Sequence, residues 1–131
     1  MMIPQSDVTV DTQQPQTVRM QLKNGCGING AADEMTRAFM ESSAGVIFDI
    51  IDRSNAEAFN FDKTLVIDRK GDSVNPGAYS KAALLITERL KIGNDQLLLQ
   101  KLAENLLDID VTIIIGSDYK NVINSLQSEV N

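Results

Sequence analysis

The sequence predicts an α+β domain, a two-layer sandwich in which a mixed sheet of about four to five strands carries two main helices on one face. Residues 18–23 alternate between apolar and polar side chains, which is typical of a strand with one buried and one wet face. Apolar, β-branched runs at 46–51 and 111–115 predict further strands. An apolar stripe over 79–90 recurs at helical spacing. Two helices cannot cover both faces of such a sheet, so we expect the other face to be open to water.

The length of the chain is enough for one domain with one core. It has 131 residues and a mass of 14.4 kDa, with 43% hydrophobic and 23% charged residues, which are ordinary values for a globular domain. Residues 1–16 contain Pro4, Pro15 and several Gln and Thr, so we expect a flexible leader or linker there. The domain itself is expected to span 17–122, followed by a terminal helix or tail over 123–131.

The predicted elements follow in the order strand, helix, strand, strand, helix, strand, strand. After the first strand, residues 24–30 are expected to form a glycine-rich turn. A helix is expected over 31–42, because apolar residues recur there at helical spacing and Asp33 and Glu34 place acid in its first turn.

The second and third strands are predicted at 46–51 and 64–68. The polar link between them, 53–60, is too short for a crossover helix, which takes ten or more residues. We therefore expect these two strands to pair as antiparallel neighbours. The second helix is predicted over 78–92, with Gly93 as its C-cap.

The last third of the chain contains one ambiguous segment. Residues 96–107 favour a helix by their composition, yet three consecutive leucines at 97–99 are equally compatible with a strand. The strongest predicted strand, 111–115, follows and stops at Gly116. Residues 118–126 are predicted to form a short terminal helix.

Composition argues against several classes of function. Acidic residues number 18 and basic residues 12, which gives a net charge of −6, so the basic footprint of a nucleic-acid binder is missing. The chain has no His and no Trp, and its single Cys allows no internal disulfide and no cysteine-based zinc site. No apolar run reaches transmembrane length. We expect no catalytic residue, no metal, no cofactor and no nucleic-acid partner.

One motif points to specific chemistry. Residues 25–30 read Gly-Cys-Gly-Ile-Asn-Gly, which fits the G-x-G-x-x-G fingerprint of dinucleotide binding, and Asp49 and Asp52 follow about 20 residues later. The Asn-Gly pairs at 24–25 and 29–30 are also turn dipeptides that allow positive φ. A dinucleotide fold needs successive parallel units, which the predicted hairpin would interrupt. We favour a structural turn and keep a nucleotide or small-molecule site in this loop as the alternative.

The remaining charged residues form no convergent set. Carboxylates gather at the ends of predicted strands, where solvated acids are common, and Cys26 has no His partner. Six cations are candidates for a small patch that binds an anionic polymer, although a solvated surface of mixed charge is the simpler interpretation: Arg19, Lys23, Arg37, Lys63, Arg69 and Lys70.

Several motifs recur in a recognisable order. Residues 18–25 read Val-Arg-Met-Gln-Leu-Lys-Asn-Gly and are followed by Gly27, Gly30 and Ala31. Later come Asn55-Ala56, an apolar strand at 63–67, a helix at 79–90, and a closing strand at 110–119 that ends in Gly-Ser-Asp-Tyr. In this order and spacing the motifs resemble the LytR C-terminal domain family. The resemblance spans about residues 17–119, and it aligns 96–101 with a strand.

The resemblance implies an extracytoplasmic, non-catalytic module of the cell envelope, tethered to the membrane through a segment absent from this chain. It implies no catalytic residue. Expected partners are peptidoglycan, a wall glycopolymer or a wall-assembly protein, and an exposed edge strand also allows a homodimer. The candidate ligand or interaction loop comprises Asn24, Gly25, Gly27, Gly30 and Asp118.

Overall fold

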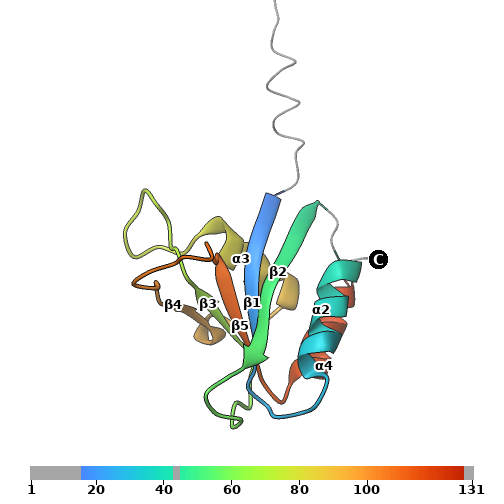
Figure 1. Ribbon diagram of the computed structural model, residues 1–131. Helices are drawn as coiled ribbons and strands as arrows, with labels where there is room; N and C mark the ends of the chain where they lie inside the picture. Colours follow the sequence, from blue (N-terminus) through green and yellow to red (C-terminus); the bar gives the residue numbers. More distant parts are fainter. Residues whose placement is uncertain (1–15, 43–44, 129–131) are drawn as a thin grey trace, which may run out of the picture.

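The computed structural model describes residues 16–42 and 45–128 of the chain. The fold is α+β, as predicted, with a mixed five-stranded sheet (Figure 1). The expected leader lies outside the described residues except for Gln16, which begins the first strand. In chain order the elements are β1 Gln16–Asn24, α2 Ala31–Glu41, β2 Val46–Asn55, β3 Leu65–Asp68, α3 Lys81–Leu90, η1 Asn94–Gln96, β4 Leu97–Leu99, β5 Val111–Ile115 and α4 Tyr119–Ser128.

The strands lie in the order β2-β1-β5-β3-β4 across the sheet. β1 pairs in parallel with both β2 and β5, whereas β3 runs antiparallel to β5 and parallel to β4. The sheet therefore combines two parallel strand-helix-strand units, β1-α2-β2 and β3-α3-β4, with β5 between them.

The predicted antiparallel pairing of 46–51 with 64–68 is wrong. β2 and β3 do run in opposite directions, but β1 and β5 lie between them. The link contains no helix, as expected, yet it forms no hairpin and instead crosses under the ends of the two intervening strands. Three strand spacings amount to about 14 Å, which an extended link of this length spans easily.

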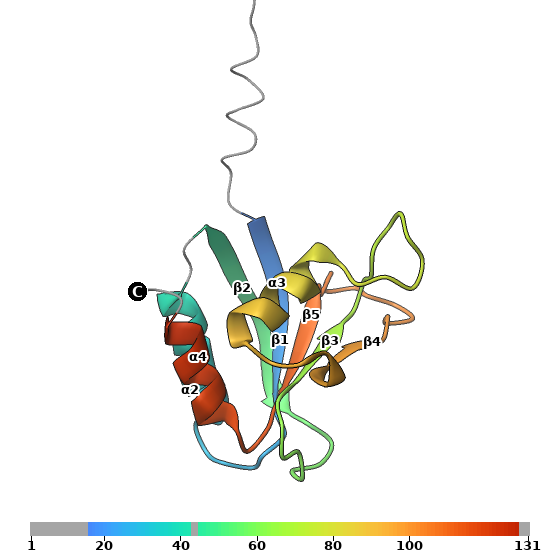
Figure 2. The ribbon, with the colours of Figure 1, turned by 180° about the vertical axis from the view of Figure 1, so that it is seen from behind.

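The three helices of the described chain pack on one face of the sheet (Figure 2), and one apolar core lies between the two layers. Phe39 of α2 packs on Phe48 of β2 with ring centroids 5.0 Å apart. The predicted short terminal helix is a full member of this layer, because Leu126 of α4 is completely buried. The largest fully buried side chains come from every part of the fold and include Met20, Leu22, Met35, Phe39, Ile86, Leu90, Ile113 and Leu126.

None of the described helices covers the opposite face, which is turned toward the viewer in Figure 1. A row of hydrogen-bonded polar side chains crosses this open face. Arg69 Nε donates to Thr112 Oγ1, the Thr112 hydroxyl donates to Gln21 Oε1, and Gln21 Nε2 donates to Asp52 Oδ2, each at 2.9 Å. The expected wet side of the first strand is therefore confirmed, and its polar groups bond to one another across the strands.

Two local predictions about α3 need correction. The helix begins at Lys81 rather than at 78, because Ser80 is its N-cap and accepts a hydrogen bond from the Ala83 N–H at 3.1 Å. It ends at Leu90, and its C-cap is Lys91 in the left-handed conformation with φ 57°, so the C-cap expected at Gly93 is wrong. The ambiguous segment 96–107 forms the short strand β4 and then a loop.

Candidate functional site

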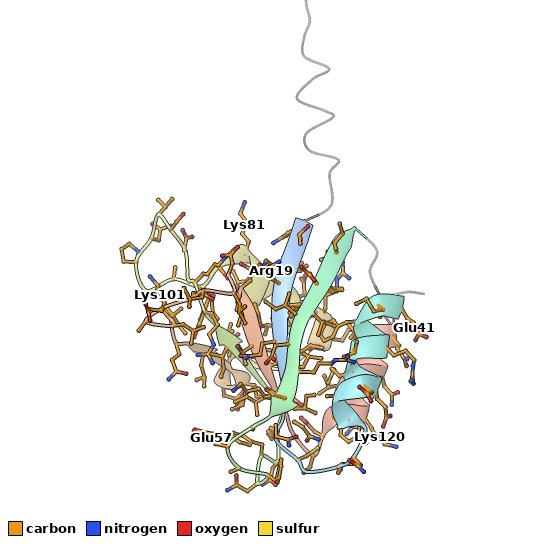
Figure 3. All side chains as sticks on the ribbon, in the orientation of Figure 1. Arg19, Glu41, Glu57, Lys81, Lys101 and Lys120 are labelled. Atoms are coloured by element: carbon orange, nitrogen blue, oxygen red, sulfur yellow. The ribbon has the colours of Figure 1, made fainter. Side chains whose placement is uncertain are left out.

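The parallel strands β1, β2 and β5 all finish at the same end of the sheet, and β3 begins there. Figure 3 places Glu57 at this end, at the bottom of the view. We call this region the glycine-loop end and define it as residues 24–30, 53–64 and 116–118. All five residues of the predicted interaction loop lie in it.

Asn24 closes the glycine loop on itself. Its Oδ1 accepts hydrogen bonds from the backbone N–H groups of Cys26 (3.1 Å) and Gly27 (3.0 Å), and its Nδ2 donates to the Ile28 carbonyl (2.9 Å). An asparagine side chain that folds back in this way imitates a backbone turn. Gly27 and Gly30 have φ of 74° and 87°, a region that glycine enters at no steric cost. The Asn24 amide is therefore committed to the shape of the loop.

Residues 56–64, which we call the crossing segment, pass under the ends of β1 and β5. The Ala56 N–H donates to the Asn24 carbonyl at 2.9 Å, and the Phe61 N–H donates to the Gly25 carbonyl at 3.1 Å. A Cβ atom on Gly25 would lie 2.8 Å from Phe61 Cδ1. The same Cβ atom would lie 2.7 Å from Ile114 Cγ2 of β5, so glycine at this position makes room for side chains of both β5 and the crossing segment.

Asp118 fastens the far end of the crossing segment to the sheet. Its Oδ1 accepts hydrogen bonds from the Thr64 N–H (2.9 Å) and the Thr64 hydroxyl (2.7 Å), and Thr64 Oγ1 accepts from the Gly116 N–H (3.1 Å). A Cβ atom on Gly116 would lie only 2.3 Å from the carbonyl carbon of Lys63. The Gly-x-Asp pattern at 116–118 thus has a structural explanation, in which the glycine admits the crossing segment and the aspartate binds it.

A pocket opens between the end of β1, the start of α2 and the end of β2. Its volume is about 190 Å³, and we call it the glycine-loop pocket. Arg53 and Asp33 form an exposed ion pair in its wall, with Nη1 and Oδ1 3.2 Å apart. The Asn29 and Asn55 side chains make no hydrogen bond to another described residue. The complete lining is Asn24, Asn29, Gly30, Ala32, Asp33, Arg53, Ser54 and Asn55.

The acidic residues of the dinucleotide fingerprint lie away from this pocket. The β1-α2-β2 unit is parallel, as a dinucleotide fold requires. The expected interruption after it is present, although not as a hairpin, because no helix lies between β2 and β3 and β3 runs antiparallel to β5. Asp49 and Asp52 lie on the open face of the sheet, where Asp49 pairs with Arg19 at 3.0 Å and Asp52 accepts a hydrogen bond from Gln21. The part of β2 that lines the pocket, 53–55, contributes no carboxylate.

The start of α2 already carries negative charge. Asp33 and Glu34 lie in its first turn, as predicted, where carboxylates interact favourably with the helix dipole. Glu34 Oε2 accepts a hydrogen bond from the Tyr119 hydroxyl at 3.4 Å. Burial, and then the charge of Glu34, raises the pKa of Tyr119 above its ordinary value. A phosphate group in the glycine-loop pocket would meet the Asp33 carboxylate, whereas Glu34 lies outside the pocket lining.

The described residues place no reactive pair in the pocket. The Thr64 hydroxyl and the Asp118 carboxylate resemble a nucleophile beside a base, but Thr64 is completely buried and its oxygen is also an acceptor. Cys26 Sγ lies 3.4 Å from Asn24 Oδ1, within the loop.

In the described part of the chain, no group of three or more His, Cys, Asp or Glu residues is placed to hold a metal ion. Every buried side-chain nitrogen or oxygen there has a hydrogen-bond partner.

The cations considered for an anionic polymer do not form one patch. Arg19 pairs with Asp49, and Lys70 Nζ lies 2.8 Å from Asp110 Oδ1. Arg37 lies on a different element, α2. Arg19 and Lys70 lie near each other against 108–110, where carboxylates pair with both, whereas Arg37 lies on the helix layer, so the six cations do not form one patch.

Three residues of the pocket wall were not expected there. The sequence predicts a second strand that ends at 51 and a polar link from 53 onward, and this strand end is wrong. The parallel register instead extends β2 to Asn55, which lies opposite Asn24. The Asn55-Ala56 motif was the available signal, and Asn29 was interpreted only as a turn residue. The pairing that brings these side chains together is tertiary, so no local pattern encodes it.

Comparison of the chain with models of known families, with curated proteins and with solved structures finds no match in any of the three. No helix within the described ranges is both long enough and apolar enough to cross a membrane. The functional assignment therefore depends on the motifs and on the geometry of the glycine-loop end.

Proposed function

We propose that this protein is a non-catalytic, extracytoplasmic module of the cell envelope that binds a wall polymer or a wall-assembly partner protein. The observation that carries the proposal is that some polar side chains of the glycine-loop end make internal hydrogen bonds, whereas others make none. Asn24, Thr64 and Asp118 are committed to internal hydrogen bonds that shape the site. Asn29 and Asn55, in contrast, line the pocket as exposed residues whose side chains make no hydrogen bond to another described residue. Such an arrangement suits recognition of a polar ligand without a group poised to react with it.

The envelope setting is supported by the sequence motifs that resemble the LytR C-terminal domain family. In that setting the binding partner is peptidoglycan, a wall glycopolymer or a wall-assembly protein. The net charge of −6 repels anionic polymers at long range. Binding must therefore rely on short-range hydrogen bonds, which salt weakens little.

Co-sedimentation of the full chain with purified, insoluble peptidoglycan tests this function, followed by an assay for released reducing sugars. We expect weak sedimentation that changes little between low and moderate salt, and no sugar release. Release of reducing sugars would refute the non-catalytic assignment. Failure to sediment at both salt concentrations would exclude peptidoglycan and leave a wall glycopolymer or a partner protein as the surviving versions.

A nucleotide or other small-molecule site in the 25–30 loop is the second candidate, and the parallel β1-α2-β2 unit favours it. The pocket of about 190 Å³ is, however, smaller than the roughly 300–1,000 Å³ typical of such sites. A ligand present at 100 times its Kd adds about 2.7 kcal/mol to stability, which raises the Tm of a domain this size by several degrees. We expect no shift with millimolar NAD or ATP, and a clear shift with either would favour this candidate instead.

A further inference from the structure

We propose that the glycine-loop pocket holds a single uncharged, N-acetylated sugar unit, with Asn29 and Asn55 as its hydrogen-bonding residues. This inference rests on the proposed function and deepens it by naming the ligand class of the same site. Four properties of the pocket lead to it: its free amide groups, its charge, its size and its rigidity.

The free amide groups match the chemistry of an acetamido sugar. An asparagine side chain offers a carbonyl acceptor and an NH₂ donor, which complement the N–H and C=O of an acetamido group and the hydroxyls of a sugar ring. Asn55 is the last residue of β2, and Asn29 precedes α2, so the two amides come from different walls of the pocket.

The charge of the pocket favours a neutral ligand. Its one cation, Arg53, is paired with its one carboxylate, Asp33. Glu34, in the same helical turn, accepts a hydrogen bond from Tyr119 and lies outside the pocket lining. The pocket therefore offers no unpaired cation to a phosphate, sulfate or uronate, whereas hydroxyl and amide groups need none.

The size of the pocket suits one ring. At roughly 30 Å³ per water molecule, a volume of about 190 Å³ corresponds to about six waters. That is room for a single pyranose unit and its substituent, with the rest of a polymer lying outside. A complete dinucleotide does not fit in this volume.

The rigidity of the loop reduces the entropic cost of binding. Asn24 holds the loop through three hydrogen bonds to its backbone, and the crossing segment lies against it. Phe59, 54% exposed, packs on the same loop, because a Cβ atom on Gly27 would lie 3.2 Å from Phe59 Cβ. A preformed site of this kind loses little freedom on binding.

A nuclear magnetic resonance titration of the full chain tests the ligand class directly. The probes are the tetramer of N-acetylglucosamine, a glucose tetramer without acetamido groups, and a tetramer of galacturonic acid. We expect the side-chain NH₂ signals of Asn29 and Asn55 to shift most with the first probe, less with the second and not at all with the third. Equal shifts with the anionic tetramer, or largest shifts away from the pocket, would overturn the inference.

Variants separate this inference from the broader function. Asn29→Ala and Asn55→Ala should each raise the Kd for the acetylated tetramer about fivefold, the effect of one hydrogen bond. Asn124→Ala, on the exposed side of α4, is the matched control and should leave it unchanged. If both pocket variants also left it unchanged, the sugar site would be refuted. If the chain bound peptidoglycan but the NH₂ signals of Asn29 and Asn55 did not shift with the acetylated tetramer, only the sugar site would be refuted. If those signals shifted but the chain did not bind peptidoglycan, only the proposal that the protein binds peptidoglycan would be refuted.

Discussion

Gly25 and Gly116 are the residues at which the crossing segment approaches the ends of the sheet most closely. At both positions a Cβ atom would meet other atoms below 3.0 Å, and at Gly116 those atoms belong to the backbone of Lys63 and Thr64. Backbone atoms cannot turn away as a side chain can, so the crossing segment itself would have to move. The glycines are therefore explained by packing at the ends of β1 and β5.

Gly116→Ala should destabilise the domain by about 1–3 kcal/mol, the range expected for overpacking. Gly93→Ala is the control, because its φ is −82° and its new Cβ atom would meet the end of the exposed Asp95 side chain, which can rotate away. Urea unfolding of both variants measures the difference. Equal stability of the two variants would show that the crossing segment does not pass where the structure places it.

Lys70 connects the loop between β4 and β5 to the end of β3. Its Nζ contacts carboxylate oxygens of Asp108 and Asp110. Burial lowers the pKa of Lys70, but the hydrogen bonds and charges of the two aspartates outweigh burial and raise this pKa overall. In return, the hydrogen bond and the charge of Lys70 hold the pKa of Asp108 below its ordinary value of 3.8.

Lys70→Gln should return the pKa of Asp108 toward its ordinary value. Since the folded-state pKa of Asp108 is the lower one, its contribution to stability is present above the unfolded pKa and is lost as the pH falls through the folded pKa. Carboxyl titration by nuclear magnetic resonance measures this shift, with the exposed Lys101→Gln as the control. A pKa of Asp108 that is the same in all three proteins would contradict the contact.

At the scale of elements, the polar row on the open face connects four strands or strand ends through Arg69, Thr112, Gln21 and Asp52. Thr112 is its central member, since its hydroxyl is both a donor and an acceptor and its side chain is completely buried. An unpaired polar group at such a position costs more than the bond itself contributes.

Thr112→Val keeps the shape of the side chain but removes both hydrogen bonds. We expect a loss of about 1–3 kcal/mol, because the Arg69 Nε–H and Gln21 Oε1 lose their partner. Thr17→Val, an exposed strand position, is the matched control and should change stability by less than about 0.5 kcal/mol. Similar denaturation midpoints for the two variants would rule out the polar row as a stabilising feature.

Local patterns predicted the elements better than their pairing. The strand at 111–115 was located to the residue, since an unbroken β-branched run ends at a glycine. The antiparallel pairing of the second and third strands was wrong, because a short link limits distance but does not require neighbours. Asn24 and Gly30 were found as site residues from the loop motif, whereas Arg53, Ser54 and Asn55 join the site only through the parallel register of β2.

β2 is an edge strand of the sheet, and an exposed edge strand is the feature through which the sequence analysis allowed a homodimer. Its register to β1 shifts between Met20 and Gln21, which marks a bulge. It also carries Asp49, Asp52 and Arg53 along its length. Bulges and charged side chains discourage pairing between exposed edges, so pairing of two copies through β2 is disfavoured by these features.

At the scale of the whole molecule, the candidate binding site, the glycine-loop pocket, lies at one end of the sheet rather than on either of its faces. The helices and the core occupy one face, and the hydrogen-bonded polar row occupies the other. The ends of β1, β2 and β5 are closed by the crossing segment, which holds the glycine loop and the end of β2 around the pocket. These backbone contacts position Asn29 and Asn55 in the pocket lining, although neither side chain takes part in the hydrogen bonds that hold the fold.

The most direct test of this account is peptidoglycan sedimentation of the unchanged chain beside the double variant Asn29→Ala/Asn55→Ala, with Asn124→Ala as the control and Tm measured for all three. The account predicts that the double variant keeps its Tm within a few degrees but loses most of its sedimentation, while the control sediments as the unchanged chain does. Equal sedimentation of the double variant and the unchanged chain would contradict the assignment of the glycine-loop pocket as the binding site.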